Sequence, residues 1–249
     1  IFSPYSAFVC VSMSSSLFKD QTKAEILNLL QIKETEPKEI KLFKQFHKLI
    51  NKENSDKVLS SNIIWVNEPI NFDPETLIPN SELLGISIQK AEFSQYICDK
   101  INEEVSKATK GMISNFIIPS DVESYNSIIL SSVLYFKCDW EHKFVIDVES
   151  NDLNVKNFTL IDGTKIHVNM MQSLNRILPY AENDKFHVVS IPYLNKQYEF
   201  ILILPKNEPK VGYKNLKKLT FERLNNDLLS QLKYQKVDLK IPKFTLESK

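Results

Sequence analysis

Residues 127–144 read SIILSSVLYFKCDWEHKF and begin with a long apolar run. Ser127–Phe136 is rich in residues that favour strands, without a clean alternation of apolar and polar positions. This pattern is typical of a central strand that is covered on both faces of its sheet. We therefore expect residues 127–136 to form a buried strand.

The residues before this strand predict mainly helices. Pro4 suits the first turn of a helix, because its missing N–H has no intrahelical partner there, and Ser3 can cap that helix. We expect helices over 4–18 and 22–30, from Glu36 onward and briefly from Asp73, with strands over 58–66 and 86–91.

A further helix is expected on a surface of the fold. Phe93, Ile97, Ile101 and Val105 recur at every fourth residue, with charged residues between them. This spacing gives an amphipathic helix with one apolar stripe, so the helix lies on a surface rather than inside the core. Gly111 ends it.

Strands dominate the sequence after Phe144. In the last of them, Val237, Leu239 and Ile241 alternate with polar residues. The chain has no internal repeat, low-complexity run or linker, which favours one interlocked α+β domain. The expected elements are a polar pair joined by a turn at Asp162 and Gly163, a strand over 177–180, a hairpin around Asn195, helical turns over 216–232 and a strand over 237–246.

The composition is that of an ordinary soluble globular protein. The chain has 249 residues, 43% of them hydrophobic, and its 31 basic and 31 acidic side chains give a formal net charge of zero. A neutral chain argues against a nucleic-acid partner. Only 4 glycines are present, far apart, so no glycine-rich cradle for a dinucleotide or phosphate is available and no cofactor is expected.

The histidines and cysteines predict no metal site. No histidine belongs to an HExxH motif or has a histidine partner at i+3 or i+4, and the cysteines form neither a CxxC pair nor a disulfide framework. These residues are His47, His142, His167 and His187, and Cys10, Cys98 and Cys138.

The uncharged stretch Ile1–Phe18 does not predict a membrane span. It contains 6 serines and Pro4 within 18 residues, which is too polar and barely long enough to cross a bilayer. We expect a buried helix of a soluble core and no membrane partner.

Four stretches carry motifs in a fixed order: FSPYSAF at 2–8, INEEVSKATKGMISNFI at 101–117, IILSSVLYFKCDWEHKF at 128–144 and VDLKIPKFTLES at 237–248. Together they resemble the serpin family, the inhibitors of serine and cysteine proteases. The resemblance implies an α+β, serpin-like fold, with helices packed around a large mixed central sheet and two smaller β-sheets. It also implies that residues 1–249 are a single domain truncated at both ends, without the first helix and the reactive loop.

A serpin is not an enzyme but offers an exposed loop as bait to a protease. After cleavage the loop inserts into the central sheet as a new strand and distorts the attached protease. The implied partner is a serine protease, with a cysteine protease as an alternative, and the implied full-length form is a monomer. The reactive-site bond is absent from this chain. A noninhibitory serpin-fold carrier or chaperone is the alternative function.

The resemblance assigns Ser3, Ser6 and Ser132 to the shutter, where the central sheet parts. Small hydroxyls fit this role, because buried polar groups can exchange hydrogen-bond partners at about 1 kcal/mol each. The family usually has Asn at the position of Ser132. The alternative is that Ser3 is only a helix cap and Ser132 only a small core residue.

Two further regions follow from the resemblance. Trp140 and Lys243 correspond to the breach at the top of the sheet, and Cys138 stands where the family usually has Gly. Thr109, Gly111 and Asn115 correspond to the end of the helix that covers the sheet, with Gly111 as a left-handed C′ residue.

Lys41, Lys44, Lys48 and Lys52 share one face of the third expected helix. Some serpins bind heparin-like polyanions through the corresponding helix. The reading that we favour is a solvated face, since the stripe has no arginine for bidentate sulfate contacts.

Asn157, Phe158 and Thr159 form an N-glycosylation sequon. Secretion, the commonest habit of the family, is the expected location. The cytoplasm is the alternative, which three unpaired cysteines would suit.

Overall fold

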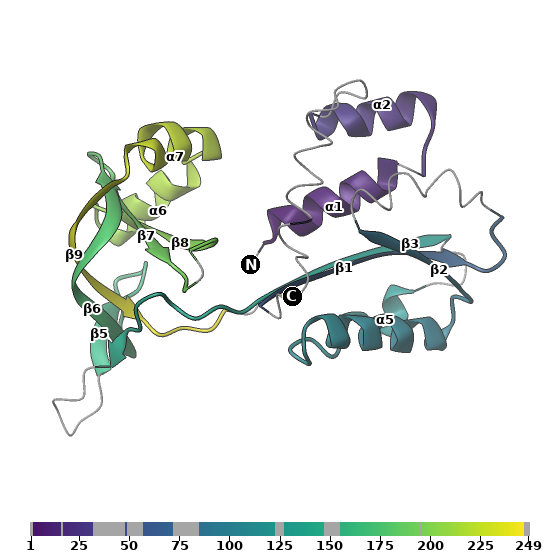
Figure 1. Ribbon diagram of the computed structural model, residues 1–249, viewed down its shortest axis with the longest axis horizontal. Helices are drawn as coiled ribbons and strands as arrows, with labels where there is room; N and C mark the ends of the chain where they lie inside the picture. Colours follow the sequence, from purple (N-terminus) through teal and green to yellow (C-terminus); the bar gives the residue numbers. More distant parts are fainter. Residues whose placement is uncertain are drawn as a thin grey trace. The chain divides into compact units, whose positions relative to one another are not determined.

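The structure, a computed structural model, describes residues 2–15, 17–31, 48, 57–71, 85–122, 127–146, 155–194 and 196–246. The chain divides into a first unit, Ile1–Lys137, and a second unit, Cys138–Lys249 (Figure 1). Each unit is taken by itself below, and a single domain over 1–249 stays a prediction. The helices expected from Glu36 and from Asp73 lie outside the described residues, apart from helical Lys48.

A mixed sheet forms the centre of the first unit. Its strands are β1 (Val58–Asn67), β2 (Ile86–Ala91) and β3 (Ile128–Phe136), in the order β2-β1-β3. Strand β1 pairs in parallel with β2 and antiparallel with β3. The predicted strand at 127–136 is therefore confirmed as β3.

Helices cover both faces of this sheet. Helix α1 (Pro4–Ser15) lies on one face and α5 (Gln95–Ala108) on the other, as Figure 1 shows. Successive residues of β1 point to opposite faces, so Ile64 packs with α1 while Trp65 packs with α5. This two-sided burial is why β3 shows no clean alternation of apolar and polar residues, as the sequence predicts for 127–136.

The helices of the first unit agree with the expected ones within a few residues. Helix α1 ends at Ser15 rather than near Phe18, and α2 spans Asp20–Leu29. The apolar stripe of α5 is buried, as predicted, and a short helical turn, η1 (Pro119–Asp121), follows it. None of the helices in the described ranges combines the length and the apolarity that a membrane crossing requires.

A six-stranded antiparallel sheet forms the second unit. Strand β6 (Lys165–Glu182) is its longest strand and pairs with β4, β5, β7 and β9. Strands β7 and β8 form the predicted hairpin. The other bounds are β4 (Val145–Ile146), β5 (Val155–Thr159), β7 (Phe186–Pro192), β8 (Glu199–Pro205) and β9 (Lys233–Pro242).

Strand β7 has a core on each of its faces. Phe186 and Val188 pack with residues of the helical segment that follows β8, whereas Val189 and Ile191 pack with β9 and Trp140. The helical segment consists of α6 (Pro209–Lys217), α7 (Phe221–Asp227) and η2 (Leu229–Gln231).

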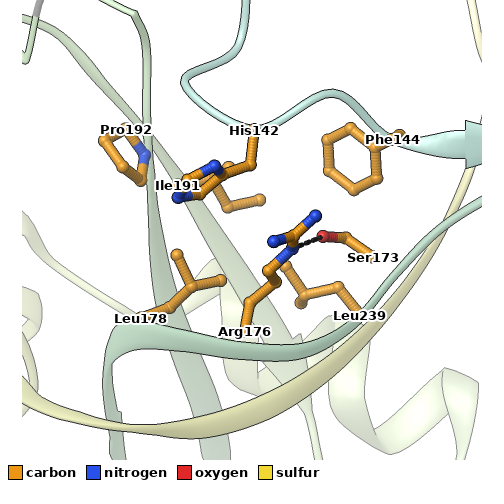
Figure 2. A pocket seen from close by; sticks show the side chains of 8 residues that line it. All are labelled: His142, Phe144, Ser173, Arg176, Leu178, Ile191, Pro192 and Leu239. Carbon is orange, nitrogen blue, oxygen red and sulfur yellow. Dashed lines mark hydrogen bonds between the residues drawn. The ribbon is translucent and has the colours of Figure 1, made fainter.

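Two boundaries in the second unit differ from the sequence prediction. The segment 177–180 is not a separate strand but part of β6, which continues past an irregularity between Ser173 and Arg176. Helix α6 begins at Pro209 rather than at Leu216, because proline is favoured in the first turn. The irregularity in β6 lets Ser173 and Arg176 line one small pocket, together with His142 and Phe144 (Figure 2).

Candidate functional site

The N-terminus of α1 brings Ser3 and Ser6 together. The Ser6 backbone N–H donates to Ser3 Oγ at 3.2 Å, and the Ser3 hydroxyl donates to Ser6 Oγ at 3.0 Å. Ser3 thus caps the helix that Pro4 begins. The capping role is present in the structure, and a shutter role for this pair stays a prediction.

Ser132 lies at the seam between β1 and β3. It stands opposite Asn62 in the antiparallel register, and its hydroxyl donates to Asn62 Oδ1 at 2.8 Å. Residues of even number in this part of β1 and β3, such as Ile64 and Leu130, pack with α1. Ser132 therefore points to the face that α1 covers, the helix whose first turn carries Ser3 and Ser6.

A second polar pair lies on the opposite face of the same seam. Trp65 Nε1–H donates to Ser131 Oγ at 3.0 Å, and both residues are buried. Sequence reasoning missed this pair. A buried indole N–H needs an acceptor, which is a signal visible in the sequence, but the acceptor lies 66 residues away and only the strand register identifies it.

Thr109 holds the end of α5. Thr109 is 2% exposed, and its hydroxyl donates to the Val105 carbonyl at 2.8 Å while accepting the Ile113 N–H at 3.1 Å. The side chain thus joins the last turn of the helix to the segment that follows it.

Gly111 is left-handed, with φ of +82°, but it is not the C′ residue. Thr109 is the C-cap, so Lys110 is C′, with φ of +52°, and Gly111 is C″. The Gly111 N–H donates to Ser106 O at 2.8 Å and the Lys110 N–H to Lys107 O at 3.3 Å. These two bonds form a Schellman motif, which places the glycine one residue later than predicted.

Asn102, rather than Asn115, holds the segment after α5. Its Oδ1 accepts the N–H groups of Phe116 and Ile117 at 2.8 and 3.0 Å, and its Nδ2 donates to Ile117 O at 2.9 Å. Asn115 itself is exposed. Nothing in the helical spacing distinguishes Asn102 from other polar positions of α5, so sequence reasoning missed it.

Trp140 is the centre of an aromatic cluster in the second unit. Its ring stacks on Tyr193, with centroids 4.6 Å apart and planes at 10°. Phe144 and Phe200 contact it edge-on at 5.5 and 5.8 Å. Trp140 also pairs with Tyr193 through an isolated backbone bridge, so rings and backbone hold this position together.

An ion pair fixes the residue next to Trp140. Glu141 Oε1 lies 2.7 Å from Lys196 Nζ, and the Glu141 backbone N–H donates to Pro192 O at 3.1 Å. The hydrogen bond between the two side chains lowers the pKa of the Glu141 carboxyl and raises the pKa of Lys196. This contact ties the Trp140 segment to the loop after β7.

The structure also describes Lys243, the second residue of the predicted breach, and Cys138, which precedes Trp140. Lys243 follows β9 with an exposed side chain, and its backbone N–H donates to Asn169 O at 2.8 Å. Cys138 is not among the residues with positive φ, so the turn before Trp140 does not require glycine. Burial and then the charge of Cys138 raise the pKa of Tyr193.

The lysine stripe and the sequon are only partly described. Lys41, Lys44 and Lys52 lie outside the described residues, and Lys48 is exposed. Asn157 is exposed on β5, opposite His167 of β6.

The polar groups of these regions can exchange hydrogen bonds. Across the described ranges, no group of three or more His, Cys, Asp and Glu side chains is arranged to hold a metal ion. The seam between β1 and β3 instead carries neutral hydroxyl, amide and indole groups, which can change partners without leaving a buried charge.

Comparison with known proteins gives one family. A family model described as Serpin (serine protease inhibitor) matches residues 1–249. A serpin-like protein of Acanthamoeba polyphaga mimivirus is 31% identical over 205 residues, which is 79% of this chain and 48% of the viral protein. The human leukocyte elastase inhibitor is 25% identical, over 82% of this chain and 55% of its own length.

Solved structures show the same fold. Native protease nexin-1, crystallised with heparin, superposes with a TM-score of 0.83 at 19% identity, over 98% of this chain and 66% of that chain. The chain thus spans about half to two thirds of the lengths of these proteins.

Proposed function

Because the chain belongs to the serpin family, we propose that the protein containing it inhibits a serine protease by cleavage and insertion of a reactive loop. A relative named as an inhibitor of leukocyte elastase supports the general role of protease inhibition. The serine-protease target is proposed from the description of the family and from that relative, and loop insertion from the sheet of the first unit.

The observation that carries the proposal is the packing of β3, which pairs antiparallel with β1 in a sheet that α1 covers on one face and α5 on the other. A strand that inserts into this sheet would gain main-chain hydrogen bonds. The face that α1 covers is apolar around the Asn62–Ser132 pair, so alternate side chains of an inserted strand would be buried there.

The seam between β1 and β3 supports a sheet that rearranges. The Ser132–Asn62 and Ser131–Trp65 bonds lie on opposite faces at neighbouring positions of β3. Each can be exchanged for about 1 kcal/mol. We therefore assign Ser132, with Asn62, to the control of sheet opening, and Ser3 and Ser6 to the same face.

The test is complex formation by the full-length protein. An inhibitor of this kind forms an SDS-stable complex with its serine protease, and cleavage of its loop by a nontarget protease raises its midpoint of thermal unfolding. A stable complex with a cysteine protease alone would mean that the target is a cysteine protease rather than a serine protease. Absence of both a complex and a gain in stability would favour the carrier or chaperone alternative.

A matched pair of variants tests the assignment of Ser132. Ser132→Ala removes the donor to Asn62, whereas Ser87→Ala changes an exposed serine of β2 in the same sheet. We expect Ser132→Ala to lower the free energy of unfolding by about 1 kcal/mol and to change the rate of loop insertion, with Ser87→Ala close to wild type. Equal insertion rates in the two variants would contradict the assignment.

A polyanion partner is a secondary candidate, because the protease nexin-1 structure was determined with heparin. Retention on heparin resin should fall with salt and be lost when Lys41, Lys44, Lys48 and Lys52 are replaced by Ala. Replacing two lysines of α5, Lys100 and Lys107, is the control. Salt-insensitive retention would rule this partner out.

Secretion is the proposed location, with the cytoplasm as the alternative that the free Cys10, Cys98 and Cys138 would suit. The exposed Asn157 makes this testable. A secreted protein that is glycosylated there would shift in mobility after glycosidase treatment, and Asn157→Gln would not. Recovery of the protein only from the cytosol would overturn secretion.

A further inference from the structure

The residues that follow α5 turn back along the helix, and we call residues 109–122 the return segment. Asn102 Oδ1 accepts the N–H groups of Phe116 and Ile117, which places the middle of the return segment beside the middle of α5. Ile117 and Val122 pack with the buried stripe of α5. The helix and the return segment therefore form one packed body.

This body packs on both β1 and β3. Trp65 of β1 and Val133 of β3 lie in one cluster with Ile97 and Ile101 of α5. Trp65 and the two isoleucines are fully buried, and Val133 is nearly so. Because protein interiors are close-packed, a face filled in this way admits further side chains only if the helix or the return segment shifts.

Lys110 joins the end of this body to β3. Its Nζ lies 5.5 Å from the centroid of the Tyr135 ring, within the distance at which an ammonium group is attracted to an aromatic face. Tyr135 is 6% exposed and, at the position that alternates with Val133, lies on the face that α5 covers. The burial of the ring strengthens the attraction, because water competes less for the charge.

The backbone fixes the position of Lys110. Its φ of +52° is disfavoured for a residue with a side chain, and the two bonds of the Schellman motif hold it in that conformation. These bonds join Lys110 to Lys107 and Gly111 to Ser106 in the last turn of α5. The base of the Lys110 side chain therefore moves with the end of the helix, and a shift of this end away from the sheet separates Lys110 from Tyr135.

We propose that Lys110 is a positioning residue, whose contact with Tyr135 holds α5 and the return segment on β3 and sets how readily they leave the sheet. The consequence for inhibition rests on the proposed function, because a strand that inserts into this sheet brings alternate side chains to the face under α5. Since that face is filled, α5 or the return segment has to shift to admit them. The contact itself belongs to the native fold and can be measured without insertion.

Amide hydrogen exchange of the full-length protein, measured by mass spectrometry, tests the contact. In Lys110→Met we expect the amides of the return segment to exchange about fourfold faster than in the wild type, with the exchange of α1 on the other face unchanged. Methionine is unbranched like lysine, so the variant meets the same backbone preference at φ of +52°. Lys110→Arg keeps a cation that stacks on aromatic rings and should exchange like the wild type.

Lys100→Met is the matched control. Lys100 Nζ lies 5.3 Å from the centroid of the Tyr96 ring, so this variant removes the same kind of contact from the same helix. Tyr96 is 59% exposed and belongs to α5 rather than to the sheet, so exchange of the return segment should stay at the wild-type rate. The proposal is overturned if Lys110→Met leaves this exchange unchanged, if both lysine variants raise it equally, or if α1 exchanges faster by the same factor.

The rate of loop insertion after cleavage distinguishes this proposal from the proposed function. Insertion should be about fourfold faster in Lys110→Met than in Lys100→Met, because α5 and the return segment leave the sheet more readily. Faster exchange with an unchanged insertion rate would overturn the role of Lys110 in insertion. A protein that shows the expected exchange but inserts no loop would contradict the proposed function and would still support the contact as the one that holds α5 on the sheet.

Discussion

In the first unit, β1 is covered by a helix on each face, whereas in the second unit β7 has α6 and α7 on one face and the Trp140 cluster on the other. Both strands are largely buried. The two units differ in the contacts beside the apolar core: the seam of the first sheet carries one buried and one partly buried polar pair, whereas the second unit has stacked aromatic rings.

The two kinds of contact differ in the free energy that separating the strands costs. Exchanging a hydrogen bond costs about 1 kcal/mol, whereas losing a large aromatic contact costs several. The first unit also holds most of the buried polar residues that the structure describes. These are Ser12, Ser15, Asn62, Asn67, Thr109 and Ser131, against Ser173 and Ser190 in the second unit.

The largest effect is expected from Trp140→Ala. Removing the ring leaves Tyr193, Phe144 and Phe200 without their common partner and should lower the free energy of unfolding by about 3 kcal/mol. Urea unfolding measures the loss, and Trp140→Phe is the control that keeps an aromatic ring. A loss under about 1 kcal/mol would mean that the aromatic contacts of the second unit stabilise it no more than the hydrogen bonds of the seam stabilise the first.

A smaller effect is expected from Trp65→Phe, which removes the donor to Ser131 and shortens the ring. We expect a loss of about 1–2 kcal/mol. A double-mutant cycle with Ser131→Ala should give a coupling energy of about 1 kcal/mol, whereas a cycle with exposed Ser87→Ala should give none. Equal coupling to both serines would mean that the seam has no specific polar pair.

Gly111→Ala should cost about 1 kcal/mol, because φ of +82° disfavours a side chain even where space is free. Gly163→Ala, at φ of +92° in the second unit, is the matched control and also has open space around it. We expect similar losses in thermal or urea unfolding. A neutral Gly111→Ala would show that the end of α5 does not depend on this backbone conformation.

The smallest effect is expected from Glu141→Gln. Because Lys196 lowers the folded-state pKa of Glu141, the pair stabilises the fold above the unfolded-state pKa. That contribution is lost as pH falls through the lowered pKa. The unfolding midpoints of wild type and variant should differ by about 1–2 °C at neutral pH and converge in acid, since an exposed pair contributes little. A difference that grows in acid would contradict this sign.

Much of the fold could be predicted from local patterns. The apolar run at 128–136 and the four-residue spacing in α5 correctly indicated a two-sided strand and a surface helix. Boundaries were less accurate where one element continues into another, as in β6, because a strand that crosses a bulge interrupts its own alternation.

The candidate site was predicted less completely. Thr109 bonds to the last turn of α5 and Trp140 is the centre of an aromatic cluster, whereas Asn102 and the Trp65–Ser131 pair were missed. A polar side chain on a helix looks the same in sequence whether it faces solvent or holds a neighbouring segment. Its partner is defined only when the chain folds back on itself.

The amino-acid sequence by itself determined the family, the central strand and the absence of glycine-rich cofactor motifs, because these depend on residues close together in the chain. The tertiary structure decided which buried groups meet. Register placed Ser132 opposite Asn62, and one extra residue in β6 turned Arg176 toward Ser173. Strand register and bulges decide the face to which a side chain points. Both depend on pairing between strands that are far apart in the chain.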